Sequence, residues 1–174
     1  MAYLPIIAAC LSLVLLLSIV WTTLSVGISP MPSSRRAQST MLDLVPDDVT
    51  GTVVELGSGW GQIARSVARR WGHLSVIGYE LSPIPWMWSV ITTGAHRPRL
   101  RFYRRDFFDA DLSSVGVVLC YLYPDAMTRI SENPRIFAPG TVLISNTFRV
   151  PGWVPDEMVE LDDLYRTRVY RYVL

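Results

Sequence analysis

The chain has no lysine, no charged side chain before Arg35 and only two cysteines. Without lysine it cannot form a lysine Schiff base or hold phosphates through the lysine of a Walker motif. Cys10 and Cys120 are too few for a disulfide framework. Its 16 arginines nearly balance 15 acidic residues, and a net charge of +1 gives no overall attraction to nucleic acid. A length of 174 residues suits one domain with an appendage.

The uncharged N-terminus separates the chain into two parts. Residues 4–28 are mostly apolar, and about 20 such residues in a helix cross a membrane core. We therefore predict a transmembrane anchor over residues 1–30 and a domain over residues 31–174. A cleaved signal peptide is the alternative, but no basic residue precedes the apolar run and no clear cleavage site follows it. Arg35 and Arg36 follow the run, so the positive-inside rule places the domain in the cytoplasm.

The domain alternates between strand-like and helix-like segments. Strands are predicted at 52–56, 74–79, 99–104, 115–122 and 141–148, with weaker ones at 159–161 and 168–173. Helices are predicted at 33–44, capped by Ser33 or Ser34, and at 62–71, 83–94 and 124–130. This alternation is typical of βαβ units, so we predict an α/β fold with a doubly wound sheet.

A glycine-rich loop follows the first predicted strand, with the pattern E-x-G-x-G-x-G from Glu55 to Gly61. Glycines there let a ligand approach the backbone and the N-terminus of the next helix. A dinucleotide fingerprint would need glycine at position 62, where Gln62 stands. An acid at Glu55 suits a cationic ligand better than a pyrophosphate. An ordinary tight turn is the alternative interpretation.

Two further acids follow the next two predicted strands. Glu80 ends the second strand, where a carboxylate can accept hydrogen bonds from both ribose hydroxyls. Asp106 follows the third strand and can accept from an adenine amino group. Taken alone, Glu80 could equally be a solvated strand end. Three acids after three successive strands, together with the glycine loop, indicate S-adenosylmethionine as the cofactor.

Three sequence blocks at these positions, residues 55–59, 78–83 and 102–108, resemble seven-strand methyltransferases. With residues 121–124, 139–148 and 167–170, they are more narrowly similar to the membrane-anchored protein-lysine methyltransferases of mitochondria and their bacterial relatives. Those enzymes modify the c-type ring protein of ATP synthase and the adenine nucleotide translocase. The resemblance covers roughly residues 30–174. It implies a Rossmann-like sheet of order 3-2-1-4-5-7-6 with an antiparallel seventh strand, and a bacterial inner membrane as the location.

The motifs and the resemblance together give a candidate cofactor site. Its residues are Pro32, Ser33, Glu55, Gly57, Ser58, Gly59, Gly61, Glu80, Leu81, Asp106 and Phe107. Pro32 and Ser33 enter through the resemblance alone, which suggests that they help to close the site.

Candidate catalytic residues follow the fourth and fifth strands. Tyr121 and Tyr123 are expected to form an aromatic channel around a lysine side chain, and Asn146 could accept a hydrogen bond from its amine. Packing at a strand end is the alternative for the tyrosines, and a loop hydrogen bond is the alternative for Asn146. His73 and His96 have no partner at metal-ligand spacing, so we expect no metal site.

These features predict an S-adenosylmethionine-dependent protein-lysine N-methyltransferase that acts on a membrane-associated protein. One alternative is an enzyme that methylates a lipid or a small membrane-soluble molecule, and another is a non-enzymatic module that binds the cofactor. A nucleic-acid methyltransferase ranks last because the net charge is low and no long basic extension is present.

Five arginines crowd the third predicted strand. They are Arg97, Arg99, Arg101, Arg104 and Arg105. Charges on an edge strand discourage pairing with other chains, which is our preferred interpretation. Contact with anionic lipid is the alternative.

Overall fold

The computed structural model describes residues 3–9, 12–13, 33–94 and 98–174. The chain divides into two compact units, Met1–Met31 and Pro32–Leu174, which we describe separately. In the first unit, residues 4–9 and 12–13 are helical and exposed. No helix within the described ranges is both long and apolar enough to span a membrane. Most of the predicted anchor lies at residues 14–32, outside the described residues, so the anchor stays a prediction.

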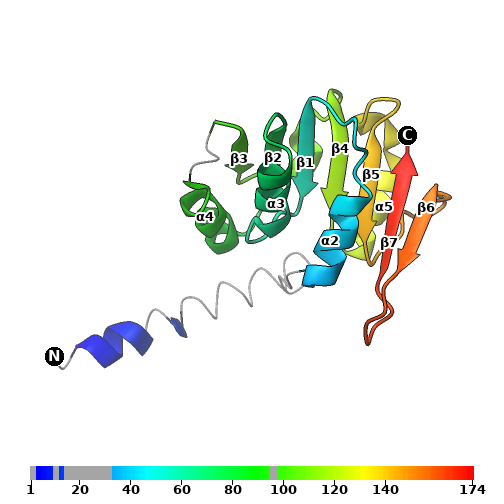
Figure 1. Ribbon diagram of the computed structural model, residues 1–174. Coiled ribbons are helices and arrows are strands. Elements are labelled where there is room, and N and C mark those ends of the chain that lie inside the picture. Colours follow the sequence, from blue (N-terminus) through cyan, green and yellow to red (C-terminus); the bar gives the residue numbers. More distant parts are fainter. Residues whose placement is uncertain (1–2, 10–11, 14–32, 95–97) are drawn as a thin grey trace. The chain divides into compact units, whose positions relative to one another are not determined.

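The second unit is built on one seven-stranded sheet with the order β3-β2-β1-β4-β5-β7-β6 (Figure 1). The strands are β1 (Thr52–Leu56), β2 (Ser75–Tyr79), β3 (Leu100–Tyr103), β4 (Val115–Cys120), β5 (Val142–Asn146), β6 (Glu157–Glu160) and β7 (Arg168–Val173). Strands β1 to β5 are parallel, whereas β7 runs antiparallel to both β5 and β6. The predicted order and the antiparallel seventh strand are confirmed.

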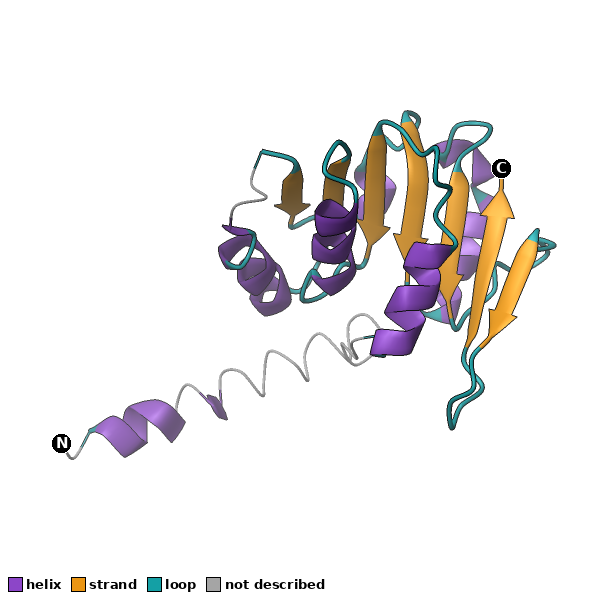
Figure 2. Cartoon of the chain, viewed as in Figure 1, coloured by secondary structure: helices purple, strands orange, loops and turns teal. Residues whose placement is uncertain are grey.

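Four α-helices cover the two faces of this sheet (Figure 2). They are α2 (Arg35–Asp43), α3 (Gln62–Arg70), α4 (Pro83–Ile91) and α5 (Pro124–Glu132). Of the two predicted caps for α2, Ser34 is the one whose hydroxyl accepts from the Ala37 N–H. Two short 3-10 helices, η2 (Phe107–Asp109) and η3 (Pro134–Ile136), were not predicted.

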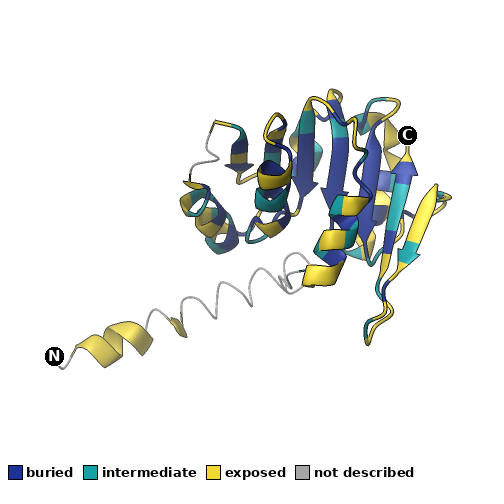
Figure 3. Cartoon of the chain, in the orientation of Figure 1, coloured by how far each residue is buried: buried dark blue, intermediate teal, exposed yellow. Residues whose placement is uncertain are grey.

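Apolar side chains form one core cluster on each side of the sheet. Ile63 and Val67 of α3 belong to the first cluster, together with Trp86 and Val90 of α4, which are partly buried. Met127 of α5 belongs to the second cluster on the opposite face. Strands β1 and β4 are buried on both faces (Figure 3). Helices α3 and α4 therefore share one face, and α5 covers the other.

The predicted edge position of the arginine-rich strand is confirmed, since β3 ends the sheet. Arg99 is not free, because its guanidinium donates to the carbonyls of Ala68 and Trp71 at the end of α3. Arg101 is exposed, and Arg97 lies outside the described residues. Arg99 therefore caps a helix in addition to protecting the edge.

Strand register brings the predicted site residues together. Leu56 pairs with Cys120 across β1 and β4, and Cys120 pairs with Ser145 across β4 and β5. The next residue of each strand continues to the same edge of the sheet. Gly57, Tyr121 and Asn146 therefore follow one another along the carboxyl ends of the strands, where ligands bind in open α/β sheets.

Candidate active site

The glycine loop between β1 and α3 has one open position and one closed position. At Gly59, with φ +50°, nothing lies within 4 Å of the place a Cβ would take. At Gly61, with φ +71°, a Cβ would lie 2.6 Å from Cζ of Phe102. A ligand can therefore approach the backbone at Gly59, whereas Gly61 is required for packing.

Phe102 of β3 also packs against β2. A Cβ at Gly78 would lie 2.5 Å from Cδ1 of Phe102, so the ring fills the space that two glycines leave. Neither Gly78 nor Phe102 was predicted as a site residue, although both lie in the sequence blocks that carry the resemblance. Their role is to seat the loop on the sheet.

Glu80 holds the glycine loop in place. Its Oε2 accepts from the Gly59 N–H at 2.7 Å, and its Oε1 accepts from the Ser82 N–H at 2.7 Å. Each carboxylate oxygen has a further lone pair, so Glu80 can still accept two hydroxyl groups. The residue thus has a structural role in addition to the ribose contact predicted for it.

Glu55 is a buried acid beside this loop, with 5% of its surface exposed. Its Oε2 accepts from the Ala64 N–H at 2.8 Å, in the first turn of α3. Burial raises the pKa of Glu55 to about 8; the hydrogen bond from Ala64 opposes this rise, the charge of Glu80 adds to it, and Arg65 opposes it. A cation bound nearby would lower this pKa and favour the carboxylate.

Ser58 contributes a buried hydroxyl that has no hydrogen-bond partner in the described part of the chain. Its backbone is well anchored, because the Ser58 N–H donates to the Tyr79 carbonyl at 2.8 Å. Unpartnered buried polar atoms are rare and call for a ligand, water or strain. The open backbone at Gly59, the spare lone pairs of Glu80 and the hydroxyl of Ser58 fit S-adenosylmethionine, with its amino, ribose and carboxylate groups.

The outer part of the predicted cofactor site has a mixed outcome. Leu81 is exposed beside Glu80, where an apolar side chain can cover a purine ring. Asp106 caps η2, since its Oδ1 accepts from the Phe108 N–H at 3.0 Å. The ring of Phe107 is buried in the second core cluster, so any contact with the cofactor would come from its backbone.

The predicted catalytic residues occupy the next positions along this edge. The ring of Tyr121 stacks on Phe148, with centroids 6.2 Å apart and planes at 15°. Tyr123 directly precedes α5 and packs partly against the second cluster. Both side chains are partly exposed, so packing accounts for a portion of each.

Asn146 is buried, and its side-chain amide is already bonded. Its Nδ2 donates to Oγ of Ser33 at 3.1 Å, and its Oδ1 accepts from the Thr147 hydroxyl at 3.2 Å. Ser33 is thereby held at the end of β5, as expected if it borders the site. The loop hydrogen bond named as the alternative for Asn146 is present. Pro32 lies outside the described residues.

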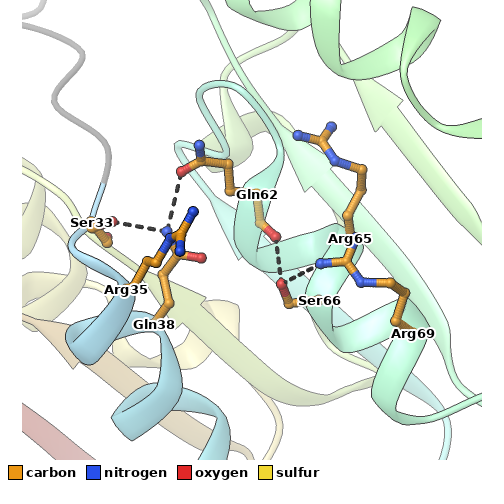
Figure 4. Close-up of a pocket in the computed structure, with 7 residues that line it drawn as sticks. All are labelled: Ser33, Arg35, Gln38, Gln62, Arg65, Ser66 and Arg69. Atoms are coloured by element: carbon orange, nitrogen blue, oxygen red, sulfur yellow. Dashed lines mark hydrogen bonds between the residues drawn. The ribbon is translucent and has the colours of Figure 1, made fainter.

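A polar cavity of about 370 Å³ lies between α2 and α3 (Figure 4). Its lining residues are Ser33, Arg35, Gln38, Gln62, Arg65, Ser66 and Arg69. The sequence reasoning missed this cavity. Arginines at positions 65 and 69, with no acid between residues 56 and 79, are the signal that could have indicated it.

Residues 55–157 match the family model described as the ANTKMT methyltransferase domain. The chain belongs to this family. With this fold and glycine loop, the chain is an S-adenosylmethionine-dependent methyltransferase.

Two protein relatives indicate the branch to which this ANTKMT-type domain is similar. It is 26% identical over 152 residues to a protein-lysine N-methyltransferase of Saccharolobus islandicus (strain REY15A), a match that covers 83% of this chain and 92% of the relative. It is 29% identical over 113 residues to the lysine N-methyltransferase of the ATP synthase c-type subunit from Xenopus laevis, and that match covers 63% of this chain and 49% of the relative. These matches establish distant homology to protein-lysine methyltransferases.

A solved structure is similar over nearly the whole domain. It is described as an RNA methyltransferase from Salinibacter ruber in complex with S-adenosyl-L-homocysteine. The TM-score is 0.73 at 29% sequence identity, with 82% of this chain and 93% of that chain covered. The bound product of that structure supports the same cofactor for this chain.

Proposed function

We propose that the chain is a protein-lysine N-methyltransferase that acts on a membrane-associated protein. The observation that supports this most is the match to the Saccharolobus enzyme, which extends over almost the full length of that protein. Further support comes from Tyr121 and Asn146, which follow β4 and β5 beside Gly57, at the edge of the sheet where an acceptor would approach the cofactor.

The chemistry requires a neutral amine aligned with a methyl group. S-adenosylmethionine supplies an electrophilic methyl group on a positively charged sulfur. A lysine has a pKa near 10.4 in water, so roughly one in 2,500 is neutral at pH 7. The aromatic rings of Tyr121 and Tyr123 would surround the lysine and exclude water, which favours the neutral amine. Orientation of the amine by these side chains then supplies most of the rate increase.

We further propose that residues 1–30 anchor the enzyme in a bacterial inner membrane, with the methyltransferase domain in the cytoplasm. The support is the uncharged run at residues 4–28, followed by Arg35 and Arg36. An anchor would confine the enzyme near membrane proteins and so raise its effective concentration toward them.

The test is a labelling experiment on membranes from a strain that lacks the enzyme. Purified full-length protein and S-adenosylmethionine with a labelled methyl group are added, and protein, lipid and RNA fractions are separated. Label in a protein band that yields methyl-lysine on hydrolysis is the expected result. Label confined to the lipid fraction would support the alternative lipid substrate instead. The Glu80→Ala variant is the matched control, because its cofactor site should be impaired.

RNA is a second candidate substrate, and one observation favours it. The solved structure named as an RNA methyltransferase is 29% identical, and the match covers 82% of this chain. The net charge of +1 weighs against it, because phosphate contacts supply much of the affinity for RNA. Label in the RNA fraction, sensitive to ribonuclease, would establish this candidate in place of the protein substrate.

A further inference from the structure

Helix α4 exposes an apolar surface that no other described element covers. Met87, Trp88 and Ile91 have 51%, 52% and 64% of their surfaces exposed, and their spacing places them on one side of the helix. The opposite side packs inward, where the Trp86 indole donates to the Phe102 carbonyl. Residues 81–94 contain no charged side chain. Exposed apolar patches of this kind on a domain mark interaction sites.

The arginine-lined cavity adjoins this apolar surface. Arg65 of α3 donates to the hydroxyl of Thr92, the residue that follows α4, at 2.8 Å and to the Trp60 carbonyl at 2.7 Å. The Trp60 and Trp88 rings are in edge-to-face contact at 6.5 Å. The apolar side chains and the cavity therefore form one continuous surface, which we call the α3–α4 face (Figure 3 and Figure 4).

The charge on the α3–α4 face is positive. Arg35, Arg65 and Arg69 line the cavity, and none of them forms an ion pair with a carboxylate in the described ranges. Residues 56–79 contain three arginines and no acid. A partner for this face must offer negative charge directly beside apolar material.

We propose that the α3–α4 face docks on a bilayer surface that contains anionic lipids. Such a surface presents phosphate groups directly above hydrocarbon, which matches arginines beside Met87, Trp88 and Ile91. Tryptophan is enriched at this interface because its ring is apolar and its N–H is polar. The apolar run at residues 4–28 is separated from Ser33, a lining residue of the cavity, by only four residues in the sequence. The inference rests on the proposed membrane attachment, and it adds a second contact made by the domain itself.

Docking would also determine where the active site lies. Ser33 lines the cavity and bonds to Asn146 at the end of β5. The α3–α4 face therefore borders the candidate active site. A docked domain would hold that site close to the membrane surface, where it reaches lysines at the ends of membrane-spanning segments rather than those of soluble proteins.

The test measures membrane contact at single positions of the full chain. Cys10→Ser removes one native thiol, and Cys120 can remain because it is buried and its pKa is raised to about 12. Ile91→Cys places an environment-sensitive fluorophore on the α3–α4 face. Thr128→Cys is the matched control, since it is also exposed to solvent but lies on α5, across the sheet. Each protein is reconstituted in vesicles of phosphatidylcholine and phosphatidylglycerol.

Lipids with brominated chains are expected to quench the label at position 91 and not the label at position 128. Combining Arg35→Gln with Arg69→Gln should lower the ratio of docked to undocked domain roughly 25-fold, at about fivefold per arginine. Equal quenching at positions 91 and 128, or no quenching at 91, would overturn the proposal. So would a label at 91 that is shielded from aqueous iodide but not reached by the lipid, because the occupant would then be protein. The measurement needs no methyl transfer, so its failure is separate from failure of the proposed substrate.

Discussion

Glu55 combines an acidic side chain with nearly complete burial, so its ionisation opposes folding. Its pKa is about 8 in the folded protein against an ordinary value of 4.5, chiefly because burial disfavours the charged form. Between these two values the folded protein holds one more proton than the unfolded chain. Its stabilising contribution is complete below about pH 4.5 and is lost as pH rises toward 8, at up to about 1.4 kcal/mol per pH unit.

Replacing Glu55 with glutamine is expected to flatten this decline in stability. The amide stays neutral, and its oxygen can still accept from the Ala64 N–H. Unfolding by urea, measured between about pH 5 and pH 9, gives the free energy of unfolding for both proteins. The same slope in wild type and Glu55→Gln would mean that another group titrates in this range.

Glu80→Ala is expected to weaken cofactor binding and to loosen the glycine loop together. The substitution removes the acceptor for the Gly59 and Ser82 N–H groups as well as the proposed ribose contact. Each lost charge-assisted hydrogen bond costs about 1.5–3 kcal/mol. Calorimetric titration with S-adenosylmethionine measures the affinity, and Glu132→Ala, which removes an exposed acid from α5, is the control. Equal affinity in Glu80→Ala and wild type would remove Glu80 from the site.

At the scale of elements, the segment that follows β4 carries the proposed acceptor site. Tyr121→Ala should lower methyl transfer by about 100-fold, because small errors in alignment have large effects on an in-line reaction. Cofactor affinity should hardly change, since the side chain would act on the acceptor. Single-turnover rates and calorimetry separate the two effects. Tyr165→Ala, at an exposed loop position, is the matched control.

The packing alternative for Tyr121 makes a different prediction. The ring stacks on Phe148, so a purely structural role would lower the melting temperature and reduce binding and turnover together. Tyr121→Phe then distinguishes ring from hydroxyl. A large loss of rate in this variant would assign the positioning of the amine to the hydroxyl group.

The elements themselves followed from the sequence where periodicity was strong. The predicted strands at 52–56 and 168–173 have those bounds in the structure, and the predicted helix at 62–71 ends one residue earlier. Helix α4 was predicted to reach residue 94 but ends at Ile91. Its apolar pattern runs out there and Gly94 has φ +56°. The 3-10 helices are three residues long, too short for any periodic signal.

The candidate site was less predictable than the sheet. Glycines and acids at strand ends identify a cofactor loop, because parallel strands bring those ends to one edge. The bond from Asn146 to Ser33 spans 113 positions in the sequence, so no local pattern indicates it. The same holds for the contact between Phe102 and the two glycines.

At the scale of the whole molecule, the prediction concerns topology. Protease added to intact spheroplasts should leave residues 35–174 uncut, because Arg35 and Arg36 follow the apolar run and no basic side chain precedes it. Lysed spheroplasts provide the control, in which the same protease should cut the domain. Digestion in intact spheroplasts would reverse the topology and separate the domain from the cytoplasmic cofactor pool.

The contact of Phe102 with Gly61 and Gly78 also restricts how this domain can change. An alanine at either glycine would collide with the ring, at 2.6 Å and 2.5 Å respectively, so each single substitution should be harmful on its own. A smaller residue at position 102 would relieve the collision and at the same time leave a void where neither glycine has been replaced. The three positions are therefore energetically coupled. A viable route between alternative sequences passes through position 102 first, and the order in which the substitutions arise decides whether the intermediate folds.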